Sequence, residues 1–357
     1  MKKSLPQNNS RAVANWVLIG VFMLLVQVIL GGITRLTGSG LSITEWDVLT
    51  GAAPPLNSQQ WITEFQKYQQ TPQYHLLHAD FTLSDFKFIF FWEWFHRFWA
   101  RMVGVVFIIG FIYLIWKRKM KQEMIKPLLT LFLLGALQGA VGWIMVASGL
   151  TGDAIYVKPT KLAVHFVLAL GLISYAFWFA LQLLIPSKEI LRNNNLRKWS
   201  WSVIVFLFFQ LMFGALMAGH KAANAAPTWP TINGDWIPSS LFSQSPLLFN
   251  FIDNKITVHF VHRGLAYLLL ALVIIWSIKA YKISSSTDYF RKSKYLPLLL
   301  ICAQIVLGVV TVLSSLQIVA NRWGIFEWLA QLHQITGMLF LLCMIYMLFI
   351  IRKSSKL

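Results

Sequence analysis

The chain has 357 residues, of which 57% are hydrophobic and only 12% charged, and its mean hydropathy is +0.61. This composition excludes an ordinary water-soluble globular protein and indicates one that crosses a membrane several times. The formal net charge of +18 suggests nucleic-acid binding at first, but the basic residues gather in short stretches between apolar segments. That placement favours a membrane-topology signal, and no nucleic-acid partner is expected.

Apolar runs long enough to cross a bilayer as helices, about 20 residues each, recur along the chain. They are Trp16–Ile33, Phe88–Trp116, Leu128–Ala147, Leu162–Ile185, Trp199–Ala218, Val258–Ile278, Tyr295–Leu316 and Trp328–Ile351. The sequence therefore predicts an all-α, polytopic membrane protein with eight transmembrane helices.

The basic residues predict the orientation of these helices. Of the 31 Lys and Arg residues, 20 fall in five short segments on one side of the membrane, beginning with Lys2, Lys3 and Arg11. The positive-inside rule then puts both termini in the cytoplasm. A cleaved secretory signal is the alternative for the first segment, but no small-residue cleavage site follows Ile33. The N-terminus lacks the Arg- and Ser-rich length of a mitochondrial presequence, which favours a bacterial inner membrane.

Four histidines lie near the outer ends of the even-numbered segments: His96, His165, His262 and His333. With both termini inside, all four fall toward the outer leaflet at similar depths. Ionisable side chains are costly in hydrocarbon, so four at one level indicate a shared task.

The sequence also repeats internally. His96-Arg97 is matched by His262-Arg263 at an offset of 166 residues, and His165 is matched by His333 at an offset of 168. This repeat predicts two tandem four-helix bundles, residues 1–192 and 193–357, related by internal duplication.

Each odd-numbered segment carries a Gln followed four residues later by a Gly. The pairs are Gln27 and Gly31, Gln138 and Gly142, Gln210 and Gly214, and Gln304 and Gly308. Small residues let helices approach closely, and amides form interhelical hydrogen bonds, so we interpret these positions as packing sites rather than as catalytic ones.

A four-helix bundle that projects one imidazole from each of two helices can hold a haem iron between them. The pattern predicts two haem-sized sites, one with His96 and His165 and one with His262 and His333. Hydrogen-bonded structural histidines are the alternative.

Other sites for a metal or a disulfide fit less well. We interpret His75, His78 and His220, in the outer loops, as structural or solvent-facing. Zinc or copper would draw carboxylates or thiols into a cluster, whereas Cys302 and Cys343 lie inside helices and are expected to be small buried hydrophobes with no extracellular disulfide.

The residues beside the histidines differ between the halves. Arg97 and Arg263 are candidates for binding haem propionates, or else their side chains reach the lipid headgroups. Arg101, Lys158 and Lys161 are weaker candidates. Glu93 stands three residues before His96, where the second half has His259. A carboxylate there can take a proton or stabilise positive charge, or it can simply pair with Arg97.

Three further stretches carry a resemblance to a known family. They are Gly31-Gly32-Ile33-Thr34-Arg35-Leu36-Thr37-Gly38-Ser39-Gly40-Leu41-Ser42 with Thr44-Glu45-Trp46, then Ala53-Pro54-Pro55-Leu56, then Glu93-Trp94-Phe95-His96-Arg97. With these stretches, the chain resembles haem A synthase over all eight helices. One branch of that family has a cysteine pair in the first outer loop. Residues 36–87 contain no cysteine, so the resemblance is to the longer proteobacterial and mitochondrial form.

The resemblance implies oxidation of the C8 methyl of haem O to the formyl group of haem A, for terminal oxidase assembly. It implies a haem b cofactor on His262 and His333, the substrate haem on His96 and His165, and Glu93 as an essential acid. The expected partners are haem O, membrane lipid, haem O synthase, cytochrome oxidase assembly factors and an electron-transfer protein.

Two other functions stay open at this stage. A di-haem b-type cytochrome that only transfers electrons has no reason to place a carboxylate in one half alone. A two-repeat transporter is expected to carry its ionisable residues near the bilayer midplane, not near one face. In the first outer loop, Trp61, Phe65 and Tyr68 fall at helical spacing. They predict an amphipathic helix that covers the first site or anchors in the interface.

Overall fold

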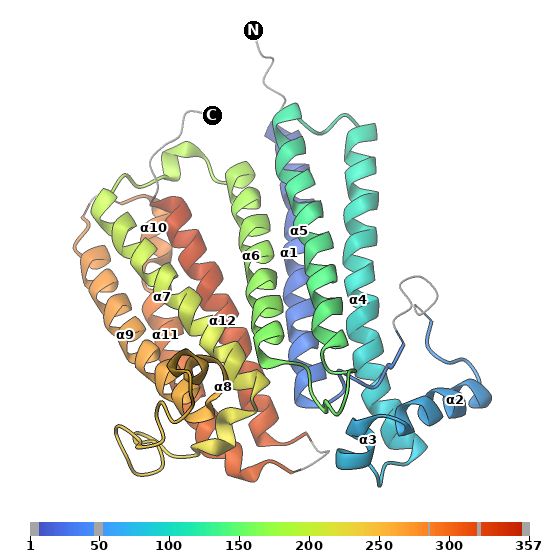
Figure 1. The fold of residues 1–357 in the computed structure, drawn as a ribbon. Coiled ribbons are helices and arrows are strands. Elements are labelled where there is room, and N and C mark those ends of the chain that lie inside the picture. The colour runs from blue at the N-terminus through green and yellow to red at the C-terminus, as the bar shows by residue number, and fades with distance from the viewer. Residues whose placement is uncertain (1–6, 46–52, 285, 320–322, 352–357) are drawn as a thin grey trace.

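The computed structural model describes residues 7–45, 53–284, 286–319 and 323–351. Eight helices within these ranges are long and apolar enough to span a membrane, as predicted. They are α1 (Gln7–Leu36), α4 (Leu83–Trp116), α5 (Gln122–Ala147), α6 (Pro159–Leu184), α7 (Asn194–Gly219), α9 (Lys255–Tyr281), α11 (Leu296–Ser314) and α12 (Ile325–Ile350). Figure 1 shows them running roughly side by side, with both ends of the chain at one end of the bundle.

The remaining elements are short and lie between the long helices. The α-helices are α2 (Ser58–Gln69), α3 (Pro72–Leu77), α8 (Asn250–Asp253) and α10 (Asp288–Ser293). The 3-10 helices are η2 (Ser187–Glu189), η3 (Ala222–Ala225), η4 (Leu247–Phe249) and η5 (Ser315–Gln317). Helices α2, α3 and α8 lie at the end of the bundle opposite the termini (Figure 1).

Polar residues in the sequence set where several helices begin. Thr82 caps α4 and forms a capping box with Asp85, which satisfies amide groups that a helix start leaves unpaired. Asn193 caps α7 through the amide of Leu196, and Asn254 caps α9 through the amides of Ile256 and Thr257. These caps fix the starts of three spanning helices at the membrane boundary.

The two halves pack differently. In the second half, α7 packs against α9, α9 against α11, α11 against α12 and α12 against α7, which closes a ring of four helices. In the first half, α1 packs against α4 and α6, and α5 packs against α6. Helices α4 and α5 meet at the stacked rings of Phe107 and Phe132. The predicted boundary near residue 193 lies between α6 and α7; the division into two domains stays a prediction.

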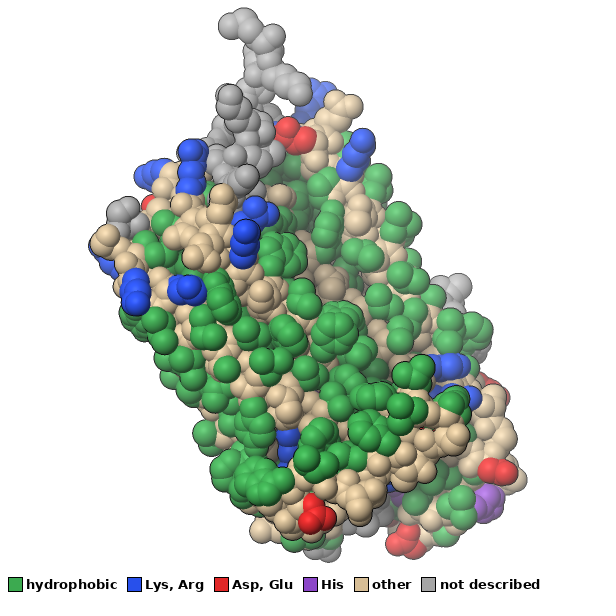
Figure 2. Space-filling view, turned by 60° about the vertical axis from the view of Figure 1, so that its left-hand side comes forward, with side chains coloured by type: hydrophobic (Ala, Val, Ile, Leu, Met, Phe, Trp, Pro, Cys, Tyr) green, Lys and Arg blue, Asp and Glu red, His purple; other side chains and the backbone are tan. Residues whose placement is uncertain are grey.

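The outer surface agrees with a membrane protein. Hydrophobic side chains cover the side of the bundle, and Lys and Arg gather at the end where the termini lie (Figure 2). Three residues named in the sequence analysis fall outside the described residues: Lys2, Lys3 and Trp46.

The amphipathic helix predicted in the first outer loop is α2. Its aromatic residues Trp61, Phe65 and Tyr68 pack against Phe86 and Phe90 at the start of α4. The apolar face of α2 therefore contacts the protein itself, and the helix rests against the base of α4.

The Tyr68 hydroxyl lies at the centre of a buried polar group in this loop. It donates to Gln73 Oε1 at 3.0 Å and lies 2.6 Å from His78 Nδ1. Burial raises the pKa of the Tyr68 phenol. His78 is buried and structural, as predicted, whereas His75 is exposed.

One prediction about the cysteines is wrong. Cys302 is exposed on α11, because α11 turns much of its surface away from the bundle. Cys343 on α12 is half-buried.

Candidate histidine-pair sites

Each of the four histidines rests on a glycine of the preceding spanning helix. A methyl group added at Gly31 would lie 3.1 Å from Cε1 of His96, and one at Gly142 would lie 2.7 Å from Cε1 of His165. In the second half, the distances are 3.2 Å from Gly214 to His262 and 2.9 Å from Gly308 to His333. At Gly142 and Gly308 a Cβ would force the imidazole to shift, and at Gly31 and Gly214 it would make a tight contact. The interpretation of the Gly positions as close-packing sites is confirmed.

The glutamine one turn before each glycine contacts the same imidazole. In the first half, Gln27 Nε2 lies 3.2 Å from both ring nitrogens of His96 and donates to the His96 carbonyl. Gln138 does the same to His165 at 3.0–3.3 Å. In the second half, Gln210 and Gln304 contact Nε2 of His262 and His333 at 3.3 Å. One Gln–Gly–His unit thus recurs on four helix pairs.

The two histidines of the second half face one another. The ring centroids of His262 and His333 are 6.4 Å apart. Metal–imidazole bonds of about 2.0–2.1 Å, with about 1.2 Å from each nitrogen to its ring centre, give a separation of about 6.4 Å. The separation of the two ring centres therefore matches the distance that a shared metal ion requires.

The tautomer of His333 also fits a ligand role. Its Nδ1 lies 3.1 Å from the carbonyl oxygen of Gln304 and must donate to it, because a carbonyl only accepts. Nε2 is then the unprotonated nitrogen of the neutral ring. Metal-ligating histidines commonly use the second nitrogen in this way to fix their orientation.

The first-half pair is more open. His96 and His165 come from α4 and α6, which both pack against α1. Within the described ranges no ring contact joins these two histidines, in contrast to His262 and His333. The side-chain oxygens of all four glutamines, Gln27, Gln138, Gln210 and Gln304, are buried without a hydrogen-bond partner among the described residues.

Glu93 is buried and accepts hydrogen bonds from three groups. Arg97 Nη2 donates at 2.5 Å, Ser42 Oγ at 2.7 Å and the Ile43 amide at 2.9 Å. The predicted i to i+4 pair with Arg97 is therefore present, and Glu93 also ties the first outer loop to α4. The carboxylate is thus surrounded by one guanidinium and two further hydrogen-bond donors.

Arg263 performs a similar task in the second half. Its guanidinium donates to His259 Nδ1 at 3.0 Å and to the backbone carbonyls of Ala226, Thr228 and Thr231 at 2.8–3.0 Å. In both halves the Arg that follows the histidine pairs with the residue four positions before the Arg, which is Glu93 or His259. It also contacts a loop. Only the first half places a negative charge at the paired position.

Two cavities lie toward the end of the bundle that holds α2, α3 and α8. One of about 180 Å³ is bordered by Arg97, Ile43 and Glu45 on one side and by Trp143 and Ala147 of α5 on the other. It adjoins the Glu93–Arg97 pair.

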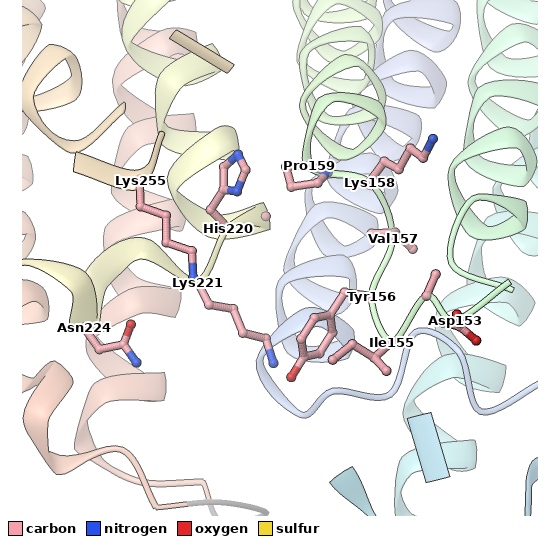
Figure 3. Close-up of a pocket in the computed structure, with 12 residues that line it drawn as sticks. Asp153, Ile155, Tyr156, Val157, Lys158, Pro159, His220, Lys221, Asn224 and Lys255 are labelled. Carbon is pink, nitrogen blue, oxygen red and sulfur yellow. The ribbon is translucent and has the colours of Figure 1, made fainter. Parts of the chain in front are cut away.

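The larger cavity, of about 550 Å³, lies between the loop that precedes α6 and the start of the α7–α9 loop. Figure 3 shows Lys221 directed at Tyr156, with its Nζ 3.7 Å from the ring centroid. None of the four paired histidines borders it. Lys158, a predicted propionate candidate, does border it, whereas Lys161 Nζ lies 3.5 Å from the Ile144 carbonyl.

Sequence reasoning missed several contacts of these sites. Ser42 ends the first family motif and Ile43 follows it, but no spacing rule connects either residue to Glu93. Gln331 and Gln334 on α12 donate to carbonyls of α1. Their signal was available, because two amides three residues apart in an apolar helix indicate an interhelical contact.

Comparison with known proteins identifies the family of the chain. Residues 14–345 match the family model COX15-CtaA, described as cytochrome oxidase assembly protein. The chain belongs to the COX15-CtaA family. The match takes in all four Gln–Gly–His units.

Similar curated members of the family carry the name Heme A synthase. The protein of Methylobacterium sp. (strain 4-46) is 39% identical over 92% of this chain and 89% of its own length. That of Flavobacterium psychrophilum is 37% identical over 95% and 98%. That of Parvibaculum lavamentivorans is 42% identical over 75% and 77%.

Proposed function

We propose that this chain is a haem A synthase, a membrane oxidoreductase that converts the C8 methyl of haem O to the formyl group of haem A. The observation that carries the proposal is the combination of two histidine pairs with one buried carboxylate, Glu93, beside the first pair only. Relatives across most of the chain's length bear that name. A protein that only relays electrons needs no such asymmetry.

The second pair is proposed to hold a resident haem b. His262 and His333 are its axial ligands, and the 6.4 Å between their ring centroids supports an iron held between them. When bound, haem b supplies a one-electron carrier for the successive oxidations. Arg263 shapes this site by holding the loop over it. A haem propionate could accept a hydrogen bond only from a guanidinium N–H that does not already donate to His259 or to the loop carbonyls.

The first pair is proposed to bind the substrate. His96 and His165 position the iron of haem O, and the cavity of about 180 Å³ beside Arg97 lies where a porphyrin edge or propionate can reach. Gln27 and Gln138 orient the two rings through the contacts described above.

Glu93 is proposed as the catalytic residue. Arg97, Ser42 and the Ile43 amide hold its carboxylate in one position. A fixed negative charge stabilises the positive charge that develops as electrons leave the methyl carbon. Ser42 and Ile43 hold it in position and bring the first outer loop over the site, which limits access of water.

The positive-inside rule supports a multi-pass protein of the bacterial inner membrane with both termini in the cytoplasm and both histidine pairs toward the outer leaflet. The proposed partners are haem O synthase as the source of substrate, cytochrome oxidase assembly factors as recipients of haem A, and an electron-transfer protein.

The test is expression in a host that makes haem O but no haem A, followed by extraction and chromatography of the haems. Haem A is expected, together with a low-spin b-type spectrum in the purified chain. His262→Ala and His333→Ala should each remove that spectrum, whereas His165→Ala should leave it. A bound b-type haem without any haem A would instead identify a di-haem cytochrome.

A further inference from the structure

The two sites meet along a polar seam between α1 and α12. Gln334 Nε2 donates to the Val28 carbonyl at 2.9 Å, and Gln331 Nε2 donates to the Ile29 carbonyl at 3.2 Å. Val28 follows Gln27, which contacts His96, and Gln334 follows His333. Each hydrogen bond therefore joins the backbone beside one histidine site to the helix that carries a ligand of the other.

Gly32 allows this approach. A methyl group at Gly32 would collide with the amide groups of both Gln331 and Gln334. Gly31, its neighbour, makes room for the His96 ring. Of these two consecutive glycines, Gly31 leaves room for His96 of the first site, and Gly32 leaves room for the α12 amides beside the second site.

The sequence repeat offers an internal comparison. By the offset between Gln27 and Gln210, Gly32 corresponds to Ala215; by the offset between His165 and His333, Gln331 and Gln334 correspond to Ala163 and Phe166. Ala163 and Ala215 are buried in an apolar cluster with Phe166 packed against it, where α6 meets α7. The α6–α7 seam therefore packs through apolar side chains alone, whereas the corresponding α1–α12 seam contains the two amides.

Polar side chains inside a membrane are costly unless they are hydrogen-bonded, and they commonly hold specific helix pairs together. Packing alone does not require the two amides, because the matching seam lacks them. Their position beside His333 on one helix and beside Gln27 on the other indicates a link between the sites.

We propose that Gln331 and Gln334 are positioning residues that couple the two histidine sites. A group bound between His262 and His333 reduces the motion of α12. The hydrogen bonds of Gln331 and Gln334 then reduce the motion of the α1 backbone that contacts His96. The identity of the two bound groups rests on the proposed function. Coupling between binding sites is reciprocal, so substrate binding must tighten the second site by the same factor.

The expected size follows from the two hydrogen bonds. Interhelical hydrogen bonds in membranes change an equilibrium on average about three-fold each. Removing both should weaken haem O binding by about eight-fold, and removing one by about three-fold, without removing either histidine pair.

The experiment compares the full-length wild-type chain with Gln331→Met/Gln334→Met, which removes the donors at similar volume. Hydrogen exchange of residues 27–33 is measured with and without bound haem b, and haem O affinity is measured by titration of the haem b-loaded protein. In the wild type, haem b should slow exchange in α1. In the double variant that response should vanish, haem b content should stay unchanged, and the haem O dissociation constant should rise about eight-fold.

Phe166→Leu at the apolar seam is the matched control and should keep the wild-type response. If the double variant does not fold, Gln334→Met alone replaces it, and its haem O affinity should fall by the smaller, single-bond amount. An α1 response that persists in the double variant overturns the coupling. A fall in the haem b content of the double variant that matches its loss of haem O affinity also overturns the coupling, because the amides then serve the second site alone. A wild-type chain that binds no haem b contradicts the proposed function instead.

Discussion

Replacing Gly308 by Ala tests whether the glycine behind each histidine sets the position of a ligand. The added Cβ would lie 2.9 Å from Cε1 and 3.5 Å from Nδ1 of His333, whereas ordinary contact begins near 3.4 Å. The imidazole must therefore move by about half an ångström in a close-packed helix pair. Overpacking of this kind costs about 1–3 kcal/mol, partly offset by a helix-propensity gain of up to about 1 kcal/mol.

If the remaining cost, up to about 2 kcal/mol, falls on the ligated state, haem b affinity drops by up to about 30-fold. The assay is haem b per chain after purification, with the optical spectrum as a check on ligation. Gly264→Ala on α9 is the control, because its added methyl group has no neighbour within 4 Å. Gly308→Ala that binds haem b as tightly as Gly264→Ala would refute the reasoning. The same series predicts the largest disturbance at Gly142, where the contact is 2.7 Å, and the smallest at Gly214, where it is 3.2 Å.

Two other substitutions test how the outer loops are held. Arg263→Lys keeps the charge but loses the forked contacts with Ala226, Thr228 and Thr231; we expect a stability loss of roughly 2–4 kcal/mol and faster proteolysis between residues 226 and 249. An unchanged cleavage rate would contradict the anchoring role. Tyr68→Phe leaves Gln73 and His78 without the central hydroxyl, and thermal unfolding should report a loss of about 1–3 kcal/mol. No loss would mean that water replaces the hydroxyl.

The membrane architecture was predictable because each span must satisfy its own backbone in hydrocarbon, which leaves long apolar runs in the sequence. Helix α4 still begins at Leu83 rather than near Phe88, because its first turns pack against α2 and obey the rules of a soluble helix. The exposed side chain of Cys302 was missed for a related reason. In a membrane both lipid and protein interior are apolar, so hydrophobicity does not reveal which side of a helix faces the bundle.

The histidine sites were predictable in part. The repeat spacing was enough to select the four histidines and the Gln–Gly pairs, since each recurs on every second helix. The contacts of Glu93 with Ser42 and Ile43 and of Arg263 with its loop were not. They depend on how irregular loops return to the helix ends, and such loops leave no periodic pattern in the sequence.

The pairing of Glu93 with Arg97 and of His259 with Arg263 separates two roles for the carboxylate. His259 accepts a hydrogen bond from Arg263 without a negative charge, so holding an arginine and a loop does not need a carboxylate. Glu93→Gln keeps an oxygen that accepts from Ser42 and Ile43 but removes the charge. If the charge serves the chemistry, this variant should keep the wild-type haem b content and resistance of the first loop to proteolysis. Haem A yield should fall about 100-fold or more. Wild-type haem A from Glu93→Gln would reduce Glu93 to a loop anchor, equivalent to His259.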